Sequence, residues 1–237
     1  MSFKDSEFLN PTNFNLPNFI DHTLLKPVAT PGDILKLCHE AQEYGFASVC
    51  VHSCYVSAAH SLLSGSSVAV CAVVGFPLGA NAPSVKAYEA AMAVRAGALE
   101  VDVVMNAGLF LGGHGDQVQQ DLEGVVLAAR GENPGAIIKV ILETCLLNDR
   151  EKASACRLAV AAGANFVKTS TGFGKSGATV RDVSLLRRIV GPGVGVKASG
   201  GIRDLSSALS MIKAGANRLG TSSGVSIIKE MGEISKG

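Results

Sequence analysis

Residues 166–172 read Phe-Val-Lys-Thr-Ser-Thr-Gly, a short apolar run that carries one lysine and then ends in glycine. A run of this length is typical of a buried strand, where the charge of Lys168 is costly because burial disfavours the ammonium form. The same burial can make a lysine reactive, because it favours the neutral amine. Only a neutral amine attacks a carbonyl, and an ordinary lysine with a pKa of ~10.4 is neutral about once in 2,500 molecules at pH 7. Lys168 is therefore a candidate nucleophile.

Seven more runs of strand length accompany this one, and helix-like segments separate them. The runs are continuously apolar and rich in Val and Ile, which is typical of strands covered on both faces. Eight strands alternating with helices favour an α/β fold whose parallel sheet closes into a (β/α)8 TIM barrel, which needs ~250 residues. The expected strands are residues 19–23, 47–51, 68–74, 101–105, 137–142, 166–170, 194–198 and 218–220.

The segments between the strands predict helices over residues 31–44, 55–63, 84–96, 116–130, 148–162, 179–190, 204–214 and 223–231. Three of them end in the same Ala-Gly-Ala joint, centred on Gly97, Gly163 and Gly215, where glycine closes a short turn into the next strand. We expect one domain, the barrel of residues 19–237, preceded by a short N-terminal lead-in of residues 1–18.

Composition excludes several classes of function. The 237 residues include 47% apolar residues, 21 basic and 20 acidic residues and no Trp, which gives a net charge of +1 with no basic run. This balance argues against binding to nucleic acid or a membrane surface. No apolar stretch approaches the ~20 residues of a membrane span, and the first residues do not resemble a signal peptide. Six scattered cysteines in apolar context predict reduced thiols in a cytoplasmic protein.

The cysteines form one cluster in the sequence, Cys50 and Cys54 with His52 between them. Their spacing differs from the Cys-x-x-Cys of zinc sites, and no second pair follows. We therefore expect no metal site and no cofactor.

A second lysine stands in the strand expected beside that of Lys168. Lys197 follows Val-Gly-Val and precedes Ala-Ser-Gly-Gly. Neighbouring strands lie ~4.8 Å apart, and two ammonium groups ~5 Å apart at an effective dielectric constant of ~20 repel by about 3.3 kcal/mol. Lys197 would thus favour the neutral, nucleophilic form of Lys168. The alternative, that both lysines point outward between helices, is disfavoured by the apolar residues on either side of each.

The two preceding strands add acids and a third lysine. Asp102 and Asn106 share one face of the fourth strand, and Lys139 and Glu143 share one face of the fifth. A buried acid near several lysines can stay ionised and relay protons. A structural ion pair between Lys139 and Glu143 remains an equal alternative.

Glycine-rich segments follow the last three strands, at residues 171–174, 199–202 and 220–224. Loops after strands seven and eight of this fold commonly bind phosphate, because their backbone N–H groups and a helix N-terminus face the anion. The serines in these loops strengthen the prediction of a phosphate site.

Six motifs in this order resemble the deoxyribose-phosphate aldolases, metal-independent barrel enzymes that form a Schiff base. They are Ile-Asp-His-Thr-Leu-Leu-Lys-Pro (20–27), Val-Gly-Phe-Pro-Leu-Gly (74–79), Glu-Val-Asp (100–102), Lys-Val-Ile-Leu-Glu-Thr (139–144), Phe-Val-Lys-Thr-Ser-Thr-Gly (166–172) and Val-Lys-Ala-Ser-Gly-Gly-Ile-Arg (196–203). The resemblance covers nearly the whole chain from about Ile20. It implies reversible cleavage of 2-deoxy-D-ribose 5-phosphate to D-glyceraldehyde 3-phosphate and acetaldehyde in deoxyribonucleotide catabolism.

The resemblance also implies a role for each matching residue. Lys168 matches the Schiff-base lysine, Lys197 the lysine that activates it, and Asp102 the acid of the proton transfer. The remaining matches are substrate-binding residues: Asp21, Thr23 and Lys139 around the sugar hydroxyls and the acid, and Gly172, Gly201, Ser222 and Ser223 at the phosphate. A homodimer or a higher homo-oligomer is compatible with the sequence.

Two positions depart from some relatives. Phe173 stands where some carry a cation after the strand-six glycine, and residues 233–237 lack a tyrosine that some carry in the C-terminal tail. Two other functions stay open: another Schiff-base lyase or transaldolase with a different sugar phosphate, and a non-catalytic barrel that binds sugar phosphates. Paired buried lysines argue against the second, because a binding protein does not require a desolvated amine.

Overall fold

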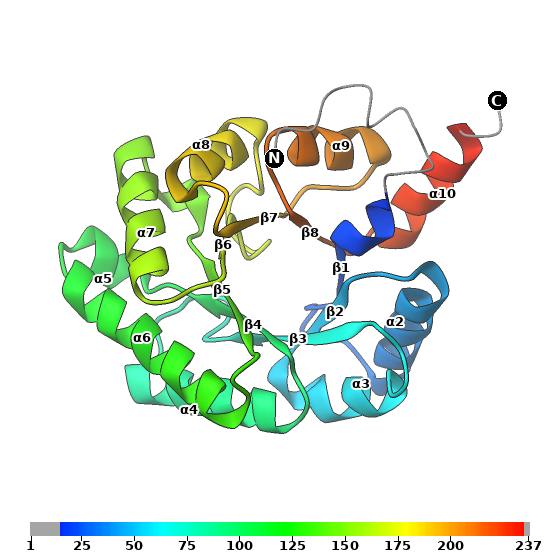
Figure 1. The fold of residues 1–237 in the computed structure, drawn as a ribbon, viewed down its shortest axis with the longest axis horizontal. Coiled ribbons are helices and arrows are strands. Elements are labelled where there is room, and N and C mark those ends of the chain that lie inside the picture. The colour runs from blue at the N-terminus through cyan, green and yellow to red at the C-terminus, as the bar shows by residue number, and fades with distance from the viewer. Residues whose placement is uncertain (1–14, 235–237) are drawn as a thin grey trace.

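Eight parallel strands form a closed barrel in the computed structural model, which describes residues 15–234. Each strand pairs with the next one along the chain, and β8 pairs with β1, so the predicted (β/α)8 TIM barrel is confirmed. Helices surround the strands (Figure 1). The strands are β1 (Ile20–Thr23), β2 (Ser48–Val51), β3 (Ala69–Val74), β4 (Glu100–Val104), β5 (Ile137–Ile141), β6 (Phe166–Lys168), β7 (Gly195–Ser199) and β8 (Arg218–Thr221).

The helices agree with the expected segments to within three residues at each end. They are α2 (Pro31–Tyr44), α3 (Val56–Leu62), α4 (Pro83–Arg95), α6 (Gly115–Glu132), α7 (Asp149–Ala161), α8 (Val180–Val190), α9 (Leu205–Lys213) and α10 (Gly224–Ile234). The sequence did not predict the short helix α5 (Ala107–Leu111) or the 3-10 turns η1 (Leu16–Phe19), η2 (Ser53–Tyr55) and η3 (Thr144–Leu146). These pieces are one turn or little more, too short for an apolar period to show.

Polar caps fix where the helices begin. Thr30 caps α2, and its side chain and that of Asp33 each accept a hydrogen bond from the other's backbone N–H. Asn148 and Glu151 form the same reciprocal capping box at α7. Such caps satisfy backbone N–H groups that have no partner within the helix, and each typically contributes about 1 kcal/mol.

The Ala-Gly-Ala joints have the geometry that their sequence predicts. Gly97, Gly163 and Gly215 have φ values of 111°, 91° and 110°, which glycine adopts without strain. In each joint the N–H of the second alanine donates to a carbonyl five residues earlier; Ala98 N, for example, lies 3.0 Å from the oxygen of Ala93. This is the hydrogen bond of a Schellman motif, and it turns the chain from the helix directly into the next strand.

Three strands end earlier than expected, and one of them is β5, which stops at Ile141. β6 stops at Lys168, and β4 stops at Val104, because the following residues turn away from the sheet. Asn106 therefore does not share a strand face with Asp102: it caps α5, where its side chain accepts a hydrogen bond from Leu109 N at 3.0 Å. The prediction that Asp102 and Asn106 share one face of this strand is wrong.

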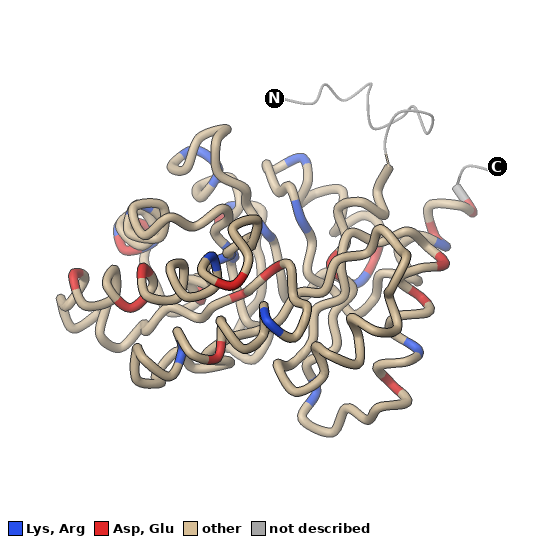
Figure 2. The backbone as a smooth tube through the Cα atoms, turned by 60° about the horizontal axis from the view of Figure 1, so that its bottom comes forward, with Lys and Arg blue, Asp and Glu red and all other residues tan. Residues whose placement is uncertain are grey.

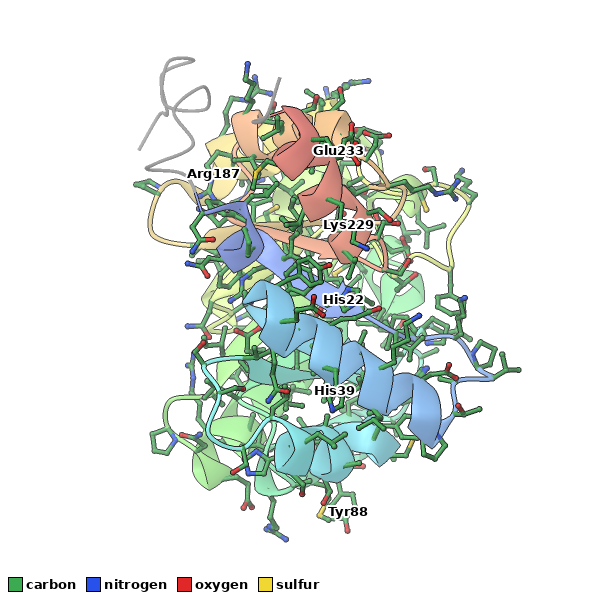
Figure 3. All side chains as sticks on the ribbon, turned by 90° about the vertical axis from the view of Figure 1, so that its right-hand side faces the viewer. His22, His39, Tyr88, Arg187, Lys229 and Glu233 are labelled. Carbon is green, nitrogen blue, oxygen red and sulfur yellow. The ribbon has the colours of Figure 1, made fainter. Side chains whose placement is uncertain are left out.

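Inward and outward side chains of the strands differ in character. Outward residues such as Val49, Val101 and Ile138 join the apolar layer between the strands and the helices. In Figure 2, basic and acidic residues are interspersed along the chain. The alternation occurs on β1, where Asp21 is fully buried inside the barrel. The next residue, His22, which is labelled in Figure 3, contacts Glu40 of α2 at 2.7 Å.

The division into a lead-in of residues 1–18 and a barrel of residues 19–237 stays a prediction, because residues 1–14 and 235–237 lie outside the described part. Within residues 15–234, none of the helices combines the length and the apolar character that a membrane crossing requires.

Candidate active site

Lys168, the last residue of β6, lies directly beside Lys197 of β7, because the register of these parallel strands pairs their Cα atoms. Only 2% of Lys168 and none of Lys197 is exposed. The Nζ atoms of both lysines lie 2.7 Å from the same oxygen, Asp102 Oδ2. The two lysines therefore point into the barrel, and the alternative that both point outward is wrong.

Asp102 of β4 accepts hydrogen bonds from three lysines. Besides Lys168 and Lys197, Lys139 Nζ contacts it, 2.9 Å from Oδ1. Burial alone would raise the pKa of this carboxyl, but the three neighbouring lysines outweigh burial and hold the pKa well below its usual range. Asp102 is thus an ionised carboxylate in a site that water does not reach.

Asp21 of β1 supplies a second buried carboxylate beside the same lysines. Its Oδ2 lies 2.5 Å from Lys197 Nζ and 3.9 Å from Lys139 Nζ. Its Oδ1 accepts hydrogen bonds from Ser48 Oγ at 2.7 Å and from Arg218. Burial alone would raise the pKa of Asp21, but the neighbouring cations outweigh it and lower the pKa.

Two residues at the N-terminal ends of strands complete this network. Glu100 begins β4 and contacts Lys139 Nζ at 2.6 Å and Arg218 Nη2 at 2.8 Å. Arg218 begins β8, contacts Asp21 as well, and keeps 13% of its side chain exposed. We call the whole network the interior cluster; it consists of Asp21, Glu100, Asp102, Lys139, Lys168, Lys197 and Arg218.

Three cations of the interior cluster are held in their charged form. Burial alone would lower the pKa of Lys197, but Asp102 and Asp21 outweigh burial and raise it. The pKa of Lys139 is raised well above its usual value in the same way, chiefly by Asp102. Burial would also lower the pKa of Arg218, yet its two carboxylate neighbours raise it.

The structure separates Lys139 from Glu143. Lys139 pairs with Asp102 and Glu100, so the ion pair between Lys139 and Glu143 that the sequence left open is wrong. Glu143 follows β5 with a φ of 53°, unusual for a residue other than glycine. Its Oε2 accepts hydrogen bonds from the hydroxyl of Thr171 and, at 3.3 Å, from Thr171 N. Glu143 thereby holds the loop after β6.

A cavity of about 330 Å³ opens at the C-terminal ends of the strands, where this fold usually has its active site. It brings together Lys168 and five of the seven substrate-binding candidates: Thr23, Gly172, Gly201, Ser222 and Ser223. Asp21 and Lys139 do not line it; they lie beneath it in the interior cluster. A Cβ on Gly172 or Gly201 would meet no atom within 4 Å, and both have positive φ, so their backbone is open to a ligand.

Sequence reasoning assigned no role to several residues of this site. Lys26 and Arg203 line the cavity and bring two cations to it. Both stand in the motifs quoted above, directly after a strand or its glycine loop, and this position was the available signal. Phe173 lines the cavity too, and its ring meets the ring of Phe76 edge to face with 5.3 Å between centroids.

The thiols of Cys50 and Cys71 lie inside the barrel next to Asp102. Cys71 Sγ is 3.1 Å and Cys50 Sγ 3.9 Å from its oxygens. These three residues are spaced closely enough to hold a metal ion, whereas Cys54, the sequence neighbour of Cys50, is exposed. Three ammonium groups already surround Asp102, and they would repel a cation. The donor set therefore does not fit a metal.

Lys168 differs from the other members of the interior cluster in its access. Among residues 15–234 it is the one member that lines the cavity. A carbonyl compound in the cavity can reach its nitrogen, and the remaining charges stay sealed below. This geometry suits an amine that forms a covalent bond with a carbonyl carbon.

Comparison with known proteins agrees with this geometry. The model of a family described as DeoC/LacD family aldolase matches residues 18–230. The chain belongs to this family. It is therefore an aldolase, a carbon–carbon lyase.

Two curated relatives span nearly the same length as this chain. The deoxyribose-phosphate aldolase of Geobacillus sp. (strain WCH70) is 56% identical over 215 residues, which cover 91% of this chain and 95% of the relative. The deoxyribose-phosphate aldolase of Carboxydothermus hydrogenoformans is 58% identical over 214 residues, 90% of this chain and 94% of the relative.

Solved structures share the fold. One described as a unique tetrameric structure of deoxyribose phosphate aldolase from Aeropyrum pernix superposes with a TM-score of 0.88 at 36% identity and covers 97% of this chain and 95% of its own. An aldolase named QR15 superposes with a TM-score of 0.87 at 42% identity and covers 93% of this chain and 97% of its own.

Proposed function

We propose that this aldolase reversibly cleaves 2-deoxy-D-ribose 5-phosphate to D-glyceraldehyde 3-phosphate and acetaldehyde through a Schiff base on Lys168. The observation that carries the proposal is the position of Lys168, a buried lysine that lines the cavity above a network of fixed charges. The proposed substrate is the one that appears in the names of the curated relatives.

The charges of the interior cluster favour a neutral Lys168. Lys139, Lys197 and Arg218 face the carboxylates of Asp21, Glu100 and Asp102, so three positive charges balance three negative ones. A protonated Lys168 also contacts Asp102, but it brings the cluster to four positive charges against three negative ones. In a buried site such an excess charge is costly, and loss of its proton into the cavity removes it.

The amine of Lys168 attacks the C1 aldehyde of the open-chain sugar. Uptake of one proton from solvent and loss of water give a protonated imine, whose positive charge Asp102 stabilises at the same nitrogen. The C3 hydroxyl then gives its proton to water in the cavity, the C2–C3 bond breaks, and its electron pair passes to the imine to form an enamine. The three carbons of glyceraldehyde 3-phosphate leave. Protonation of the enamine at C2 and hydrolysis release acetaldehyde and restore the lysine.

Asp102 serves the proton steps as a fixed negative charge that accepts hydrogen bonds. Its low pKa makes it a poor acid but a good partner for a nitrogen that gains and loses a proton in each cycle. Lys197 shares Oδ2 of Asp102 with Lys168, and its fixed charge opposes a second positive charge at that oxygen. Thr23 lies at the cavity wall, within reach of a sugar hydroxyl.

The phosphate of the substrate binds at the glycine–serine side of the cavity. Ser222 and Ser223 directly precede α10, whose N-terminus carries a partial positive charge. Gly172 and Gly201 offer open backbone, and the cations Lys26 and Arg203 favour an anion in the same cavity. The phosphate therefore has positive partners in the cavity even though Phe173 is not a cation.

We also propose that this chain forms a homo-oligomer and that it is cytoplasmic. The Aeropyrum pernix structure is described as tetrameric, which supports a homo-oligomer for this chain. The reduced cysteines and the sugar phosphate substrate support a cytoplasmic location.

The test is acetaldehyde release from 2-deoxy-D-ribose 5-phosphate in the presence of a metal chelator. We expect release at the same rate with and without the chelator. Activity only on other sugar phosphates would show that the substrate is a different one. Binding of the sugar phosphate without acetaldehyde release would indicate a sugar phosphate binding protein. A loss of activity in chelator that a divalent ion restores would indicate a metal-dependent aldolase.

A further inference from the structure

Glu100 and Arg218 lie at the opposite end of the barrel from the cavity, yet ionic contacts connect them to Lys168. Lys168 Nζ contacts Asp102 at 2.7 Å, Asp102 contacts Lys139 at 2.9 Å, and Lys139 contacts Glu100 at 2.6 Å. Glu100 in turn contacts Arg218 at 2.8 Å. The pair is the first residue of β4 and the first residue of β8.

Because these contacts are buried, their charges are weakly screened and act over a longer distance. Glu100 is 2% exposed, and Lys139 and Asp102 are fully buried, so little water screens the path. A unit charge at about 10 Å and an effective dielectric constant of about 20 changes a pKa by roughly one unit. Neither Glu100 nor Arg218 lines the cavity, and neither can contact a substrate there.

We propose that Glu100 and Arg218 are positioning residues that set, through the charge balance of the interior cluster, the protonation state of Lys168. The proposal rests on the proposed function, because it concerns the amine that forms the Schiff base. Arg218 compensates one carboxylate and so favours the neutral amine. Glu100 contributes one carboxylate and so favours the ammonium form. Removal of Arg218 and removal of Glu100 must therefore shift the balance between the neutral and the ammonium form of Lys168 in opposite directions.

All eight strands contribute charged or titratable groups to the interior. Besides the interior cluster these are the thiols of Cys50 on β2 and Cys71 on β3. Burial raises the pKa of Cys71 well above its usual value. The hydrogen bond with Cys71 lowers the pKa of Cys50. Both thiols are the same in every variant below, so a difference between the variants comes from Glu100 and Arg218.

The experiment compares the pH dependence of kcat/KM for unphosphorylated 2-deoxy-D-ribose, which has no ionisable group near neutral pH. The acidic limb of this profile then reports ionisation of the free enzyme. In Arg218→Gln the acidic limb moves up by about one pH unit, because the variant lacks a positive charge that disfavours the ammonium form of Lys168. In Glu100→Gln it moves down by about one unit. Reduced stability alone would not move the two limbs in opposite directions.

Three control variants separate charge from shape. Arg218→Lys keeps the charge and should keep the limb within a few tenths of a pH unit. The double variant Glu100→Gln/Arg218→Gln removes one charge of each sign and should return the limb close to that of the wild type. Arg95→Gln removes the same charge from an exposed ion pair with Glu132 on the helical layer and should leave the profile unchanged.

Limbs that stay in place, or that move in the same direction in the two single variants, would overturn the proposal. If Glu100→Gln does not fold, Arg218→Gln decides alone, because the partly exposed side chain of Arg218 allows water to replace it. Trapping of acetaldehyde on wild-type Lys168 with borohydride is measured in parallel. A failure of that trapping contradicts the proposed function, whereas trapping with unmoved limbs contradicts only the inference made here.

Discussion

The cavity has a floor and a rim that are built in different ways. The floor is the interior cluster, in which side chains from six strands meet and four residues, Asp21, Asp102, Lys139 and Lys197, are fully buried. The rim consists of loops after the strands, in which glycine backbone, the hydroxyls of Ser222 and Ser223 and exposed cations face the cavity. Charge at the floor is fixed before any substrate arrives, whereas the rim offers donors that remain in contact with water.

This difference predicts that the floor and the rim have different roles in the reaction. Charges that change during the reaction, those of the imine and the enamine, develop above the floor. The phosphate keeps its charge throughout, so contacts at the rim act mainly as uniform binding. Substitutions at the floor should therefore lower kcat and stability, and substitutions at the rim should change the affinity for phosphorylated substrate.

The largest effect is expected at the floor, from Asp102→Asn. The substitution removes the acceptor shared by Lys168 and Lys197 and leaves the buried ammonium groups under-compensated. We expect kcat to fall by about 10²- to 10⁴-fold, the usual range for a residue of the proton steps, and stability to fall by roughly 3–5 kcal/mol. Steady-state kinetics and denaturant unfolding measure the two effects. Wild-type kcat in a folded variant would show that Asp102 has only a structural role.

The floor should also make stability depend on pH. The folded pKa values of Asp21 and Asp102 lie below the unfolded value of ~3.9, so their stabilisation is present above that value and is lost as pH falls toward the folded values. Each unit of depression contributes about 1.4 kcal/mol. Tm should drop between about pH 5 and pH 2, less steeply in Asp102→Asn. The rim variant Ser222→Ala is the matched control and should parallel the wild type; identical curves for all three proteins would contradict the prediction.

At the rim, Ser222→Ala removes one hydroxyl donor for the phosphate. A hydrogen bond to a charged group contributes about 1.5–3 kcal/mol, so kcat/KM for the phosphorylated sugar should fall roughly 10- to 150-fold. Unphosphorylated deoxyribose has no anion to lose, and its turnover should hardly change. Equal losses on both sugars would place Ser222 in the chemistry or the fold and move the phosphate site elsewhere.

The smallest effect is expected from Phe173→Ala, also at the rim. The ring of Phe173 is 54% exposed and meets mainly that of Phe76, and an edge-to-face pair contributes about 0.5–1.5 kcal/mol. Tm should fall by only a few degrees, because about 1 kcal/mol shifts a domain of this size by about 2–4 °C. A fall of about 10 °C or more in a calorimetric scan would mean that the rim loop is part of the folding core.

Sequence reasoning reached the barrel and part of its floor because both follow from short-range rules. Apolar runs and cap residues locate strands and helices, and adjacent strands bring Lys168 beside Lys197. The meeting of Lys168, Lys197 and Asp102 follows from the same strand periodicity. The roles of these residues remain proposals, which the experiments described here test.

Other parts of the site depend on distances across the barrel that a sequence does not contain. Glu100 and Arg218 meet although 118 positions separate them, because each is the first residue of its strand and β4 and β8 stand opposite each other in the closed barrel. Asn106 and Glu143 were misplaced because their strands end early and a cap or a positive φ redirects the side chain. The sequence could not show that Asp21 lies below the cavity instead of lining it.

The measurement that tests the central claim most directly is reductive trapping of the imine. Borohydride added to the enzyme with acetaldehyde reduces a Schiff base to a stable ethyl group on the lysine that formed it. Peptide mass spectrometry should find this ethyl group on the peptide that contains Lys168, and Lys168→Met should abolish it. An ethyl group on Lys197 instead, or spread over surface lysines such as Lys36, would contradict the account.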